Sequence, residues 1–509
     1  MSCPQRREAW PVKIGNVTIG SSYPVAVQSM TSTSTMDTPA SVAQIKRIVD
    51  AGGEIVRLTA QGVREAENLG EIRQELRRSG YDAPLVADIH FNPKAAFAAA
   101  SRVEKVRINP GNFVDPGRVF KKIEFTDEEY ADELAKIETA LVPLLDLCKD
   151  HGTALRIGVN HGSLSDRIMS RYGDTPEGMV ESAMEFLRVC LRHDFRNVAI
   201  SIKASNVVVM TTTVRLLVAA MDAEDMHFPL HLGVTEAGDA EDGRIKSAVG
   251  IGSLLADGIG DTIRVSLSEE PECEIPVARL ILNHISQMGE SEGLTPMDCS
   301  GRPTPVVTGY DPEPADMVMI SGEGASLSRD LGRKLMEIGT GDGRRVILHA
   351  TYPAGMSAEE LTVAASIDLG RLLLAGYGDG VQIDCDGMDR KWLSDLALGI
   401  LQATRRRISR TEFISCPGCG RTLYDLQSTL KDIKGATAHL KGLKIGVMGC
   451  IVNGPGEMAD ADYGYVGAGV GKISLYKGKE CIVKNIPAEE AIPRLIALIK
   501  ENGDWIDPA

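Results

Sequence analysis

The chain has 509 residues, of which 43% are hydrophobic and 25% are charged, a composition that builds folded cores and excludes long disordered stretches. At this length we expect about two to four domains. The 55 Lys and Arg residues against 70 Asp and Glu residues give a formal net charge of −15. Such a surface repels nucleic acid and anionic membranes, so an anionic ligand needs a local, sheltered group of cations.

Hydrophobic segments and cysteines indicate the compartment. The sequence has no apolar run of about 18 residues, the length that a membrane helix needs, and no apolar segment follows Arg6 and Arg7 near its start. We therefore expect a cytoplasmic protein with no membrane partner. Ten cysteines are too sparse for a disulfide framework in a chain of this length. The group formed by Cys416, Cys419 and Cys450 needs its own explanation.

The first half of the chain alternates short β-branched runs with segments of helical periodicity. After a hairpin-like start at 12–19, eight candidate strands occur at 24–29, 54–59, 84–89, 105–110, 154–160, 197–204, 229–237 and 262–267. The linking segments carry apolar residues at helical spacing and often end near Gly. Eight strand–helix units over about 250 residues predict a (β/α)8 TIM barrel rather than an open sheet, and we assign it to residues 1–290.

Polar residues stand near the carboxyl ends of nearly all of these strands, although barrel strands are buried on both faces. Each could be a buried ion pair or a rim residue if taken singly. Together they include five cations, which would repel one another at one mouth unless counter-charge arrives. An anionic ligand with phosphate or diphosphate groups would supply it. The strand-end residues are Gln28, Ser29, Arg57, Asp88, His90, Arg107, Asn109, Arg156, Asn160, His161, Lys203, Ser205, Asn206, Glu236, Arg264 and Ser266.

Two further features belong to the seventh unit. Lys246 precedes a small-residue stretch with Gly250 and Gly252, which we interpret as a turn that opens a helix and presents N–H groups to a phosphate. Glu236 is the acidic residue expected among the cations. It is either a structural ion-pair partner or a proton donor or acceptor, and the sequence alone does not rank the two.

The region from 291 to 410 partly repeats the barrel. Residues 252–261 align with residues 370–379 at an offset of 118, so a helix, a turn and the next strand are echoed. Further upstream the alignment shifts by one residue, and Glu236 aligns with Pro353. At the offset of 118, Lys246 aligns with Ala364. The insert therefore lacks both the carboxylate and the cation. We infer an insert domain that is a truncated relative of the last β/α units, with their packing retained and their chemistry lost. Chance resemblance of two Gly-rich amphipathic units is the alternative. Residues 411–509 form the third predicted domain.

The third domain contains Cys416-Pro-Gly-Cys419 and, further on, Cys450 in a Gly- and Pro-rich loop. Three thiolates in tight turns are typical of a metal centre. Structural zinc would need a fourth ligand, for which His439 and Cys481 are candidates. An iron–sulfur cluster could instead use Glu457, seven residues after Cys450. Spacing alone leaves both kinds of centre open, and a redox dithiol would not need Cys450.

Nine motifs in order resemble the GcpE (IspG) family of 4-hydroxy-3-methylbut-2-enyl diphosphate synthases, over residues 12–290 and 405–485. They are Val-Gln-Ser-Met-Thr (27–31), Ala-Asp-Ile-His-Phe (87–91), Arg-Ile-Asn-Pro-Gly-Asn (107–112), Arg-Ile-Gly-Val-Asn-His-Gly-Ser-Leu (156–164), Ser-Ile-Lys-Ala-Ser (201–205), Val-Thr-Glu-Ala-Gly (234–238), Gly-Ile-Gly-Asp-Thr-Ile-Arg-Val-Ser-Leu (258–267), Cys-Pro-Gly-Cys-Gly-Arg (416–421) and Gly-Cys-Ile-Val-Asn-Gly-Pro-Gly-Glu (449–457).

The resemblance implies a [4Fe-4S] cluster on Cys416, Cys419 and Cys450, with Glu457 as an exchangeable fourth ligand, in an α+β domain. It implies the substrate 2-C-methyl-D-erythritol 2,4-cyclodiphosphate, whose ring is opened and dehydroxylated with two electrons from flavodoxin or ferredoxin, a step of isoprenoid biosynthesis. Glu236 is the first candidate for protonating the departing hydroxyl and His90 the second. The expected substrate-binding residues are Arg57, Asp88, Arg107, Asn109, Asn112, Arg156, Asn160, His161, Lys203, Ser205, Asn206, Lys246, Arg264 and Ser266.

The insert departs from the common two-domain pattern of this family, in which the cluster domain of one subunit caps the barrel of its partner. We expect a homodimer, although the added spacer could allow one chain to cap itself. The alternative from another class is a zinc-stabilised, phosphate-binding barrel protein without redox activity.

Overall fold

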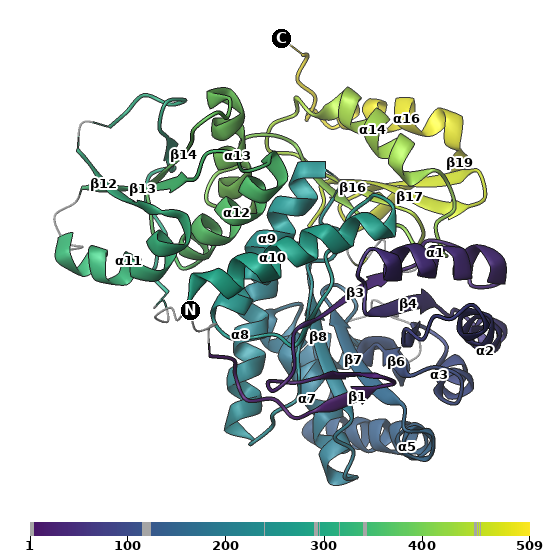
Figure 1. Cartoon of the computed structure of the whole chain (residues 1–509). Helices are drawn as coiled ribbons and strands as arrows, with labels where there is room; N and C mark the ends of the chain where they lie inside the picture. Colours follow the sequence, from purple (N-terminus) through teal and green to yellow (C-terminus); the bar gives the residue numbers. More distant parts are fainter. Residues whose placement is uncertain are drawn as a thin grey trace.

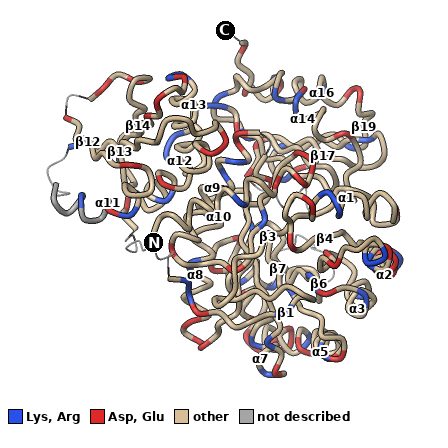
Figure 2. Tube along the Cα trace, viewed as in Figure 1, with Lys and Arg blue, Asp and Glu red and all other residues tan. Residues whose placement is uncertain are grey.

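The structure is a computed structural model that describes residues 5–114, 124–238, 240–289, 294, 296–314, 316–338, 344–451, 456, 458 and 460–508. Figure 1 shows a barrel in the lower part of the view, with a smaller sheet-and-helix unit at the upper left and a third unit at the upper right. Lys and Arg are interspersed with Asp and Glu along outer helices such as α2, α5 and α7 (Figure 2). None of the described helices combines the length and hydrophobicity needed to cross a membrane.

The first unit is built on a sheet of eight parallel strands, as the sequence predicts. Their order is β8-β7-β6-β5-β4-β3-β10-β9, and a parallel bridge between Ile200 and Leu230 joins the two ends, so the sheet is nearly closed. The seventh and eighth strands are shorter than predicted. The strands are β3 (Ala26–Met30), β4 (Ile55–Thr59), β5 (Leu85–Asp88), β6 (Lys105–Ile108), β7 (Ala154–Asn160), β8 (Val198–Lys203), β9 (His231–Leu232) and β10 (Thr262–Ile263).

Helices cover the outside of this sheet, and polar caps fix where several of them begin. Asp37 accepts a hydrogen bond from the N–H of Ala40, and Thr126 with Glu129 forms a reciprocal capping box. The helices are α1 (Thr38–Asp50), α2 (Val63–Arg78), α3 (Pro93–Ala100), α4 (Pro110–Phe113), α5 (Asp127–His151), α6 (Asp166–Tyr172), α7 (Pro176–Arg192), α8 (Val207–Ala223), α9 (Ala240–Ala256) and α10 (Glu274–Met288), with the 3-10 turn η1 (Pro271–Cys273) before α10.

An N-terminal hairpin closes the amino end of the barrel. Strands β1 (Val12–Ile14) and β2 (Val17–Ile19) pair antiparallel. The buried Val12, Ile14 and Ile19 pack in one apolar cluster with residues at the starts of barrel strands, among them Ile55 and Val86. The buried Lys105 is a cation beside this cluster, and the polar residues of the predicted mouth lie at the opposite end, where the strands finish.

The second unit is a parallel sheet of order β11-β14-β13-β12. Its elements are β11 (Val306–Val307), β12 (Met317–Glu323), α11 (Gly324–Ile338), β13 (Arg345–Tyr352), α12 (Ala358–Leu374), β14 (Gly380–Cys385) and α13 (Arg390–Ala403). Helix α12 and strand β14 begin 118 residues after α9 and β10. Gly380 pairs with Val306 and Ile347, as Thr262 pairs with Ala26 and His231 in the barrel. This shared order and register supports the hypothesis of a partial repeat of the barrel.

Helices α9 and α12, which this alignment equates, pack against each other. A Cβ on Gly252 would lie 2.5 Å from Ile367, and a Cβ on Gly370 would lie 2.8 Å from Val249, so each glycine receives a β-branched side chain from the other helix. The two contacts are symmetric. At the offset of 118, Gly252 aligns with Gly370 and Val249 aligns with Ile367, so each glycine contacts the residue that its counterpart's partner aligns with. The insert is therefore joined to the barrel through close contact between α9 and α12. The domain limits at 290 and 410 stay predictions.

The third unit is the predicted α+β domain. Its sheet has the order β15-β16-β17-β18-β19, parallel through the first three strands and antiparallel beyond. Its own apolar core includes Leu430, Ile445 and Leu495. The elements are β15 (Glu412–Ser415), α14 (Leu426–Thr437), β16 (Lys444–Met448), β17 (Tyr463–Gly469), β18 (Lys472–Lys477), β19 (Glu480–Pro487) and α16 (Ala488–Glu501).

Candidate functional site

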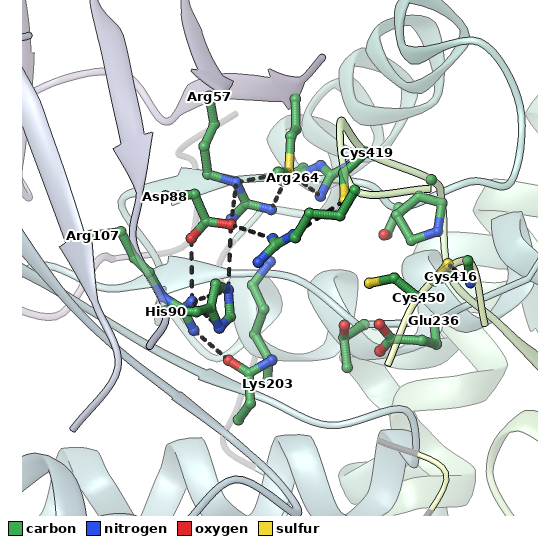
Figure 3. Close-up of a pocket in the computed structure, with 18 of the residues that line it drawn as sticks. Arg57, Asp88, His90, Arg107, Lys203, Glu236, Arg264, Cys416, Cys419 and Cys450 are labelled. Atoms are coloured by element: carbon green, nitrogen blue, oxygen red, sulfur yellow. Dashed lines mark hydrogen bonds and ion pairs between the residues drawn. The ribbon is translucent and has the colours of Figure 1, made fainter. Parts of the chain in front are cut away.

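One cavity lies between the barrel mouth and the third unit of the same chain. Barrel side chains enclose one side, and the loops after β15 and β16 enclose the other (Figure 3). The lining residues are Met30, Arg57, Asp88, His90, Arg107, Arg156, Asn160, Lys203, Thr235, Glu236, Arg264 and Ser266 from the barrel, and Cys416, Pro417, Gly418, Cys419, Arg421, Met448, Gly449 and Cys450 from the third unit. The structure thus brings together the five cations predicted at the strand ends and all three predicted cysteines.

Asp88, at the end of β5, is the acidic centre of the cavity. Its carboxylate is 3.2 Å from Arg107 Nη1, 3.2 Å from Arg421 Nη2 and 3.9 Å from Arg57 Nε. Burial alone would raise the pKa of Asp88, but the charges of Arg57 and Arg107 outweigh it and hold this pKa well below its usual value. Asp88 is therefore a permanent anion that organises three arginines from two units.

His90 lies within this arginine cluster and is uncharged. Its Nε2 is 2.6 Å from Arg107 Nη1, and Arg421 adds a second nearby charge. Burial and these cations lower the pKa of His90 to about 3, in spite of the attraction of Asp88. A neutral imidazole among arginines is a hydrogen-bonding group and a weak acid, which disfavours His90 as a proton donor.

Protein groups supply part of the counter-charge that the sequence pattern led us to expect from a ligand. The buried Glu274 of α10 forms a two-pronged ion pair with Arg264, through Nη2 at 2.9 Å and Nε at 3.1 Å. Arg57, besides its contact with Asp88, donates a hydrogen bond to the sulfur of Met30, with Nη2 and Sδ 2.9 Å apart. Neither Glu274 nor Met30 is predicted from the sequence as a site residue, because a helix residue and an apolar side chain carry no signal of such contacts.

Arg156 and Lys203 carry positive charge that no described carboxylate neutralises at hydrogen-bond distance. Nε and Nη1 of Arg156 are buried without a hydrogen-bond partner among the described residues. Burial, with the charge of Arg57, holds the pKa values of Arg156 and Lys203 well below their usual values. The surroundings of both side chains thus disfavour their positive charges, so an anion bound beside them would be stabilised.

Glu236 stands on the other side of the cavity, beside the cysteine loops (Figure 3). It is 6% exposed and has a positive φ of 47°, a strained conformation for a non-glycine residue that is often found at functional sites. The next residue, Ala237, forms a parallel bridge with Ser415, which directly precedes Cys416. The carboxyl group of Glu236 and the thiol of Cys416 are therefore held on two backbone segments that are paired with each other.

The three cysteines come from two loops and line the cavity together. The sulfur of Cys416 accepts a hydrogen bond from the N–H of Gly449 at 3.3 Å, and that of Cys419 accepts one from Arg421 Nε at 3.5 Å. Such donors stabilise thiolates and are typical around iron–sulfur clusters. Among the described residues no three His, Cys, Asp or Glu side chains are placed to hold a single metal ion. The predicted ligand Glu457 lies outside the described residues.

Six predicted substrate-binding residues do not line this cavity: Asn109, Asn112, His161, Ser205, Asn206 and Lys246. Local hydrogen bonds and packing account for the positions of several of these side chains. Asn109 caps α4, and Asn206 caps α8 by accepting hydrogen bonds from two N–H groups. His161 is 3.6 Å from Asp174. Asn112 is buried beside the carbonyl of His90, and Ser205 is buried just after β8.

The prediction of a phosphate-binding turn at Lys246 and the glycines after it is wrong. The sequence pattern predicts a turn that opens a helix, but residues 246–252 lie inside α9. Lys246 Nζ is 3.2 Å from Glu412, the first residue of β15, so it joins the barrel to the third unit. Gly250 and Gly252 allow neighbouring side chains to approach the helix closely and do not form a phosphate-binding turn.

Comparisons with known proteins agree with this arrangement. A model of the GcpE TIM-barrel domain matches residues 9–279, which is more than half of the chain, and a model of the GcpE protein C-terminal domain matches residues 412–501. The chain belongs to the GcpE family. The two matches leave residues 280–411 between them, close to the predicted insert.

Curated relatives of this GcpE protein are similar over almost their whole length. Proteins named 4-hydroxy-3-methylbut-2-en-1-yl diphosphate synthase (flavodoxin) are 51% identical in Parabacteroides distasonis (99% of this chain, 99% of the relative), 51% identical in Bacteroides fragilis (98% and 96%) and 44% identical in Akkermansia muciniphila (99% and 98%). The first alignment spans 607 positions, against 509 residues here, so that relative has segments that this chain lacks.

Proposed function

We propose that this GcpE-family chain catalyses the reductive ring opening of 2-C-methyl-D-erythritol 2,4-cyclodiphosphate to 4-hydroxy-3-methylbut-2-enyl diphosphate, the reaction of isoprenoid biosynthesis that its relatives' names indicate. One observation carries the proposal. A single cavity is lined on one side by buried cations and on the other by three cysteines, so a substrate anion and a redox centre would meet in it.

The cations would bind the cyclic diphosphate. Arg156 and Lys203 have positive charges that no described carboxylate neutralises at hydrogen-bond distance. Arg107 is paired with Arg156 on the neighbouring strand β6, and Arg57 lines the same cavity from β4. A diphosphate would satisfy the donors of Arg156 that have no partner among the described residues and would offset the mutual repulsion of the cations. Asn160 and Ser266, which also line the cavity, are neutral groups that fit the phosphate or hydroxyl oxygens. The positions found off the cavity stay predictions.

Cys416, Cys419 and Cys450 would hold a [4Fe-4S] cluster, with Glu457 as the predicted fourth ligand. The donor set fits, because three thiols share one wall and two of them accept hydrogen bonds from N–H groups. When bound, such a cluster supplies single electrons and a Lewis-acidic iron. Arg421 would then lie between the cluster and Asp88, where its charge stabilises both the thiolate of Cys419 and the carboxylate.

Glu236 would donate the proton that the departing hydroxyl needs. It is buried at the cavity wall beside Cys416, and its strained backbone is held by the bridge between Ala237 and Ser415. The second candidate, His90, is neutral and bonded to Arg107, which favours Glu236 for this step.

The names of the relatives also indicate an electron donor for this chain. We propose flavodoxin as electron donor, as in the names of the relatives, with ferredoxin as the alternative. A homodimer and a cytoplasmic location stay predictions from the sequence. A dimer is not needed to complete the cavity, because one chain supplies both of its walls.

The zinc-stabilised scaffold is less well supported. Its candidate fourth ligands lie elsewhere, since His439 bonds to the carbonyl of Ile506 beside Trp505, and Cys481 is in β19. Anaerobic purification tests the choice. We expect about four irons per chain, absorbance near 400 nm and turnover of the cyclodiphosphate with a chemical reductant. A colourless protein that holds zinc and leaves the cyclodiphosphate intact would overturn the proposal.

A further inference from the structure

Three side chains on adjacent strands of the insert form a hydrogen-bonded chain. Ser321 Oγ of β12 is 2.9 Å from His349 Nδ1 of β13, and His349 Nε2 is 2.8 Å from Asp384 Oδ2 of β14. The strands are parallel neighbours, with Ser321 paired to His349 in register. A hydroxyl, an imidazole and a carboxylate in this order are the arrangement that activates a serine for nucleophilic attack.

The partners determine which nitrogen of His349 carries the proton. The pKa of Asp384 is held below its usual value by Gln382 and His349, against the effect of burial, so Asp384 is an anion that only accepts hydrogen bonds. Nε2 therefore carries the hydrogen, and Nδ1 is left to accept the hydroxyl proton of Ser321. Gln382 Nε2 donates to the same carboxylate oxygen at 2.8 Å and fixes its orientation.

The three hydrogen-bonded side chains lie near the carboxyl ends of their strands, where catalytic groups of parallel sheets are found. Counting from the matched register, Ser321 occupies the position of Lys203 in the barrel, and Gln382 occupies that of Arg264. The cations that would bind a diphosphate are thus absent from these equivalent positions. This half-barrel has lost the chemistry of the barrel mouth and carries a different set of groups.

A cavity of about 250 Å³ adjoins Asp384 and Gln382. Its walls include the apolar Met317, Met319 and Leu393 and two opposite charges, Arg390 and Glu313. Ser321 itself is exposed, so a small substrate can reach its hydroxyl. Met317 and Met319 stand four and two positions before Ser321 on the same face of β12, so the cavity would accept the apolar acyl group of an ester held at Ser321.

We propose that Ser321, His349 and Asp384 form a second site, which transfers acyl groups from small carboxylic esters to water. Ser321 Oγ attacks the ester carbonyl while its proton passes to His349, and the bond to the alcohol breaks as that alcohol takes the proton back. A water molecule, deprotonated by His349, then hydrolyses the acyl-serine to release the acid and restore the serine. No redox partner is involved, and the proposal does not rest on the function proposed for the barrel.

The test uses the full-length protein with 4-nitrophenyl acetate and, separately, with a fluorophosphonate probe whose adduct is located by mass spectrometry. We expect the probe on Ser321, with labelling lost in Ser321→Ala and ester hydrolysis lowered about 100-fold in His349→Gln, the usual scale of general-base catalysis. Ser286→Ala, an exposed serine of α10, is the matched control and should be labelled as the parent is. Thermal unfolding establishes that each variant is folded.

A probe that leaves Ser321 unmodified in folded protein would overturn the proposal. So would labelling of Ser321 at an equal rate in His349→Gln, because the serine would then react without activation. If the parent protein showed no activity on the cyclodiphosphate, only the function proposed for the barrel site would be overturned. The two proposals are therefore tested independently.

Discussion

Arg421 donates a hydrogen bond to Asp88, with Nη2 and Oδ2 3.2 Å apart, and thereby joins the third unit to the barrel at the centre of the cavity. Its Nε donates to the sulfur of Cys419 at 3.5 Å. One buried guanidinium therefore connects a proposed cluster ligand to the carboxylate that organises the cations. Through this contact, closure of the two units and the electrostatics of the proposed cluster depend on each other.

Replacing Arg421 with Gln should lower the reduction potential of the bound cluster, because a positive charge beside a thiolate stabilises the reduced, more negative state. We also expect turnover to fall about 10-fold or more, as the buried Asp88 loses one of its partners. Spectroelectrochemical titration measures the first effect. Arg494→Gln, at an exposed position of α16, is the control, and an unchanged potential in Arg421→Gln would contradict the assigned contact.

Replacing Glu236 with Gln should leave the absorbance of the cluster intact and reduce turnover at least about 100-fold, because the amide cannot donate the required proton. Steady-state assays with a chemical reductant measure this without a protein donor. His90→Gln provides the comparison and should lose less, since His90 is neutral in the parent. Near-normal turnover of Glu236→Gln would remove its role as the acid.

Replacing Cys450 with Ser should prevent assembly of a complete cluster, whereas Cys481→Ser should retain it, because Cys481 lies in β19 and not at the cavity. Iron and sulfide analysis of anaerobic protein distinguishes the two variants. Four irons per chain in Cys450→Ser would refute its assignment as a ligand. Loss of metal in Cys481→Ser would instead favour the zinc site.

The barrel and the insert share a partly buried ion pair whose strength depends on pH. His284 Nε2 of α10 is 2.8 Å from Asp368 Oδ1 of α12, and Tyr352 donates to the other carboxylate oxygen at 3.0 Å. Burial alone would lower the pKa of His284, but the charge and hydrogen bond of Asp368 raise it above its usual value. The stabilisation is then fully present below the unfolded pKa of about 6.5 and is lost as the pH rises through the folded pKa.

The free energy of unfolding should therefore fall as the pH rises from about 6.5 through the raised pKa of His284, with a slope of at most about 1.4 kcal/mol per pH unit for this one proton. His284→Gln should remove this part of the pH dependence while keeping a hydrogen bond to Asp368. Denaturant unfolding at several pH values measures it. A parent protein and a variant with parallel pH profiles would show that the pair contributes nothing.

Sequence patterns predicted the barrel and its polar mouth because both leave local signals. Eight β-branched runs mark the strands, and residues such as Arg156 and Lys203 stand out as charges at the ends of buried strands. Long-range partners leave no such signal. Glu274 reaches Arg264 from a helix, and Arg421 reaches Asp88 from another unit, 333 positions away in sequence.

Lys246 shows how a local pattern can mislead. Small residues after a lysine are typical of a phosphate-binding turn, but glycines serve equally where two helices approach closely. Gly252 has that second role against Ile367, and Lys246 meets Glu412. Only the fold distinguishes the two uses. The strained backbone of Glu236 is likewise a property of the folded chain that its residue type does not reveal.

The central claim is that the cations and the cysteines of one chain form one active site. It is tested most directly by mixing two inactive variants, Lys203→Met, which lacks a cation of the cavity, and Cys450→Ser, which lacks a cluster ligand. If each chain closes its own site, the mixture stays inactive after co-refolding or co-expression at any ratio. Recovery of about a quarter of the parent turnover, as expected when sites form between the chains of a dimer, would contradict the account.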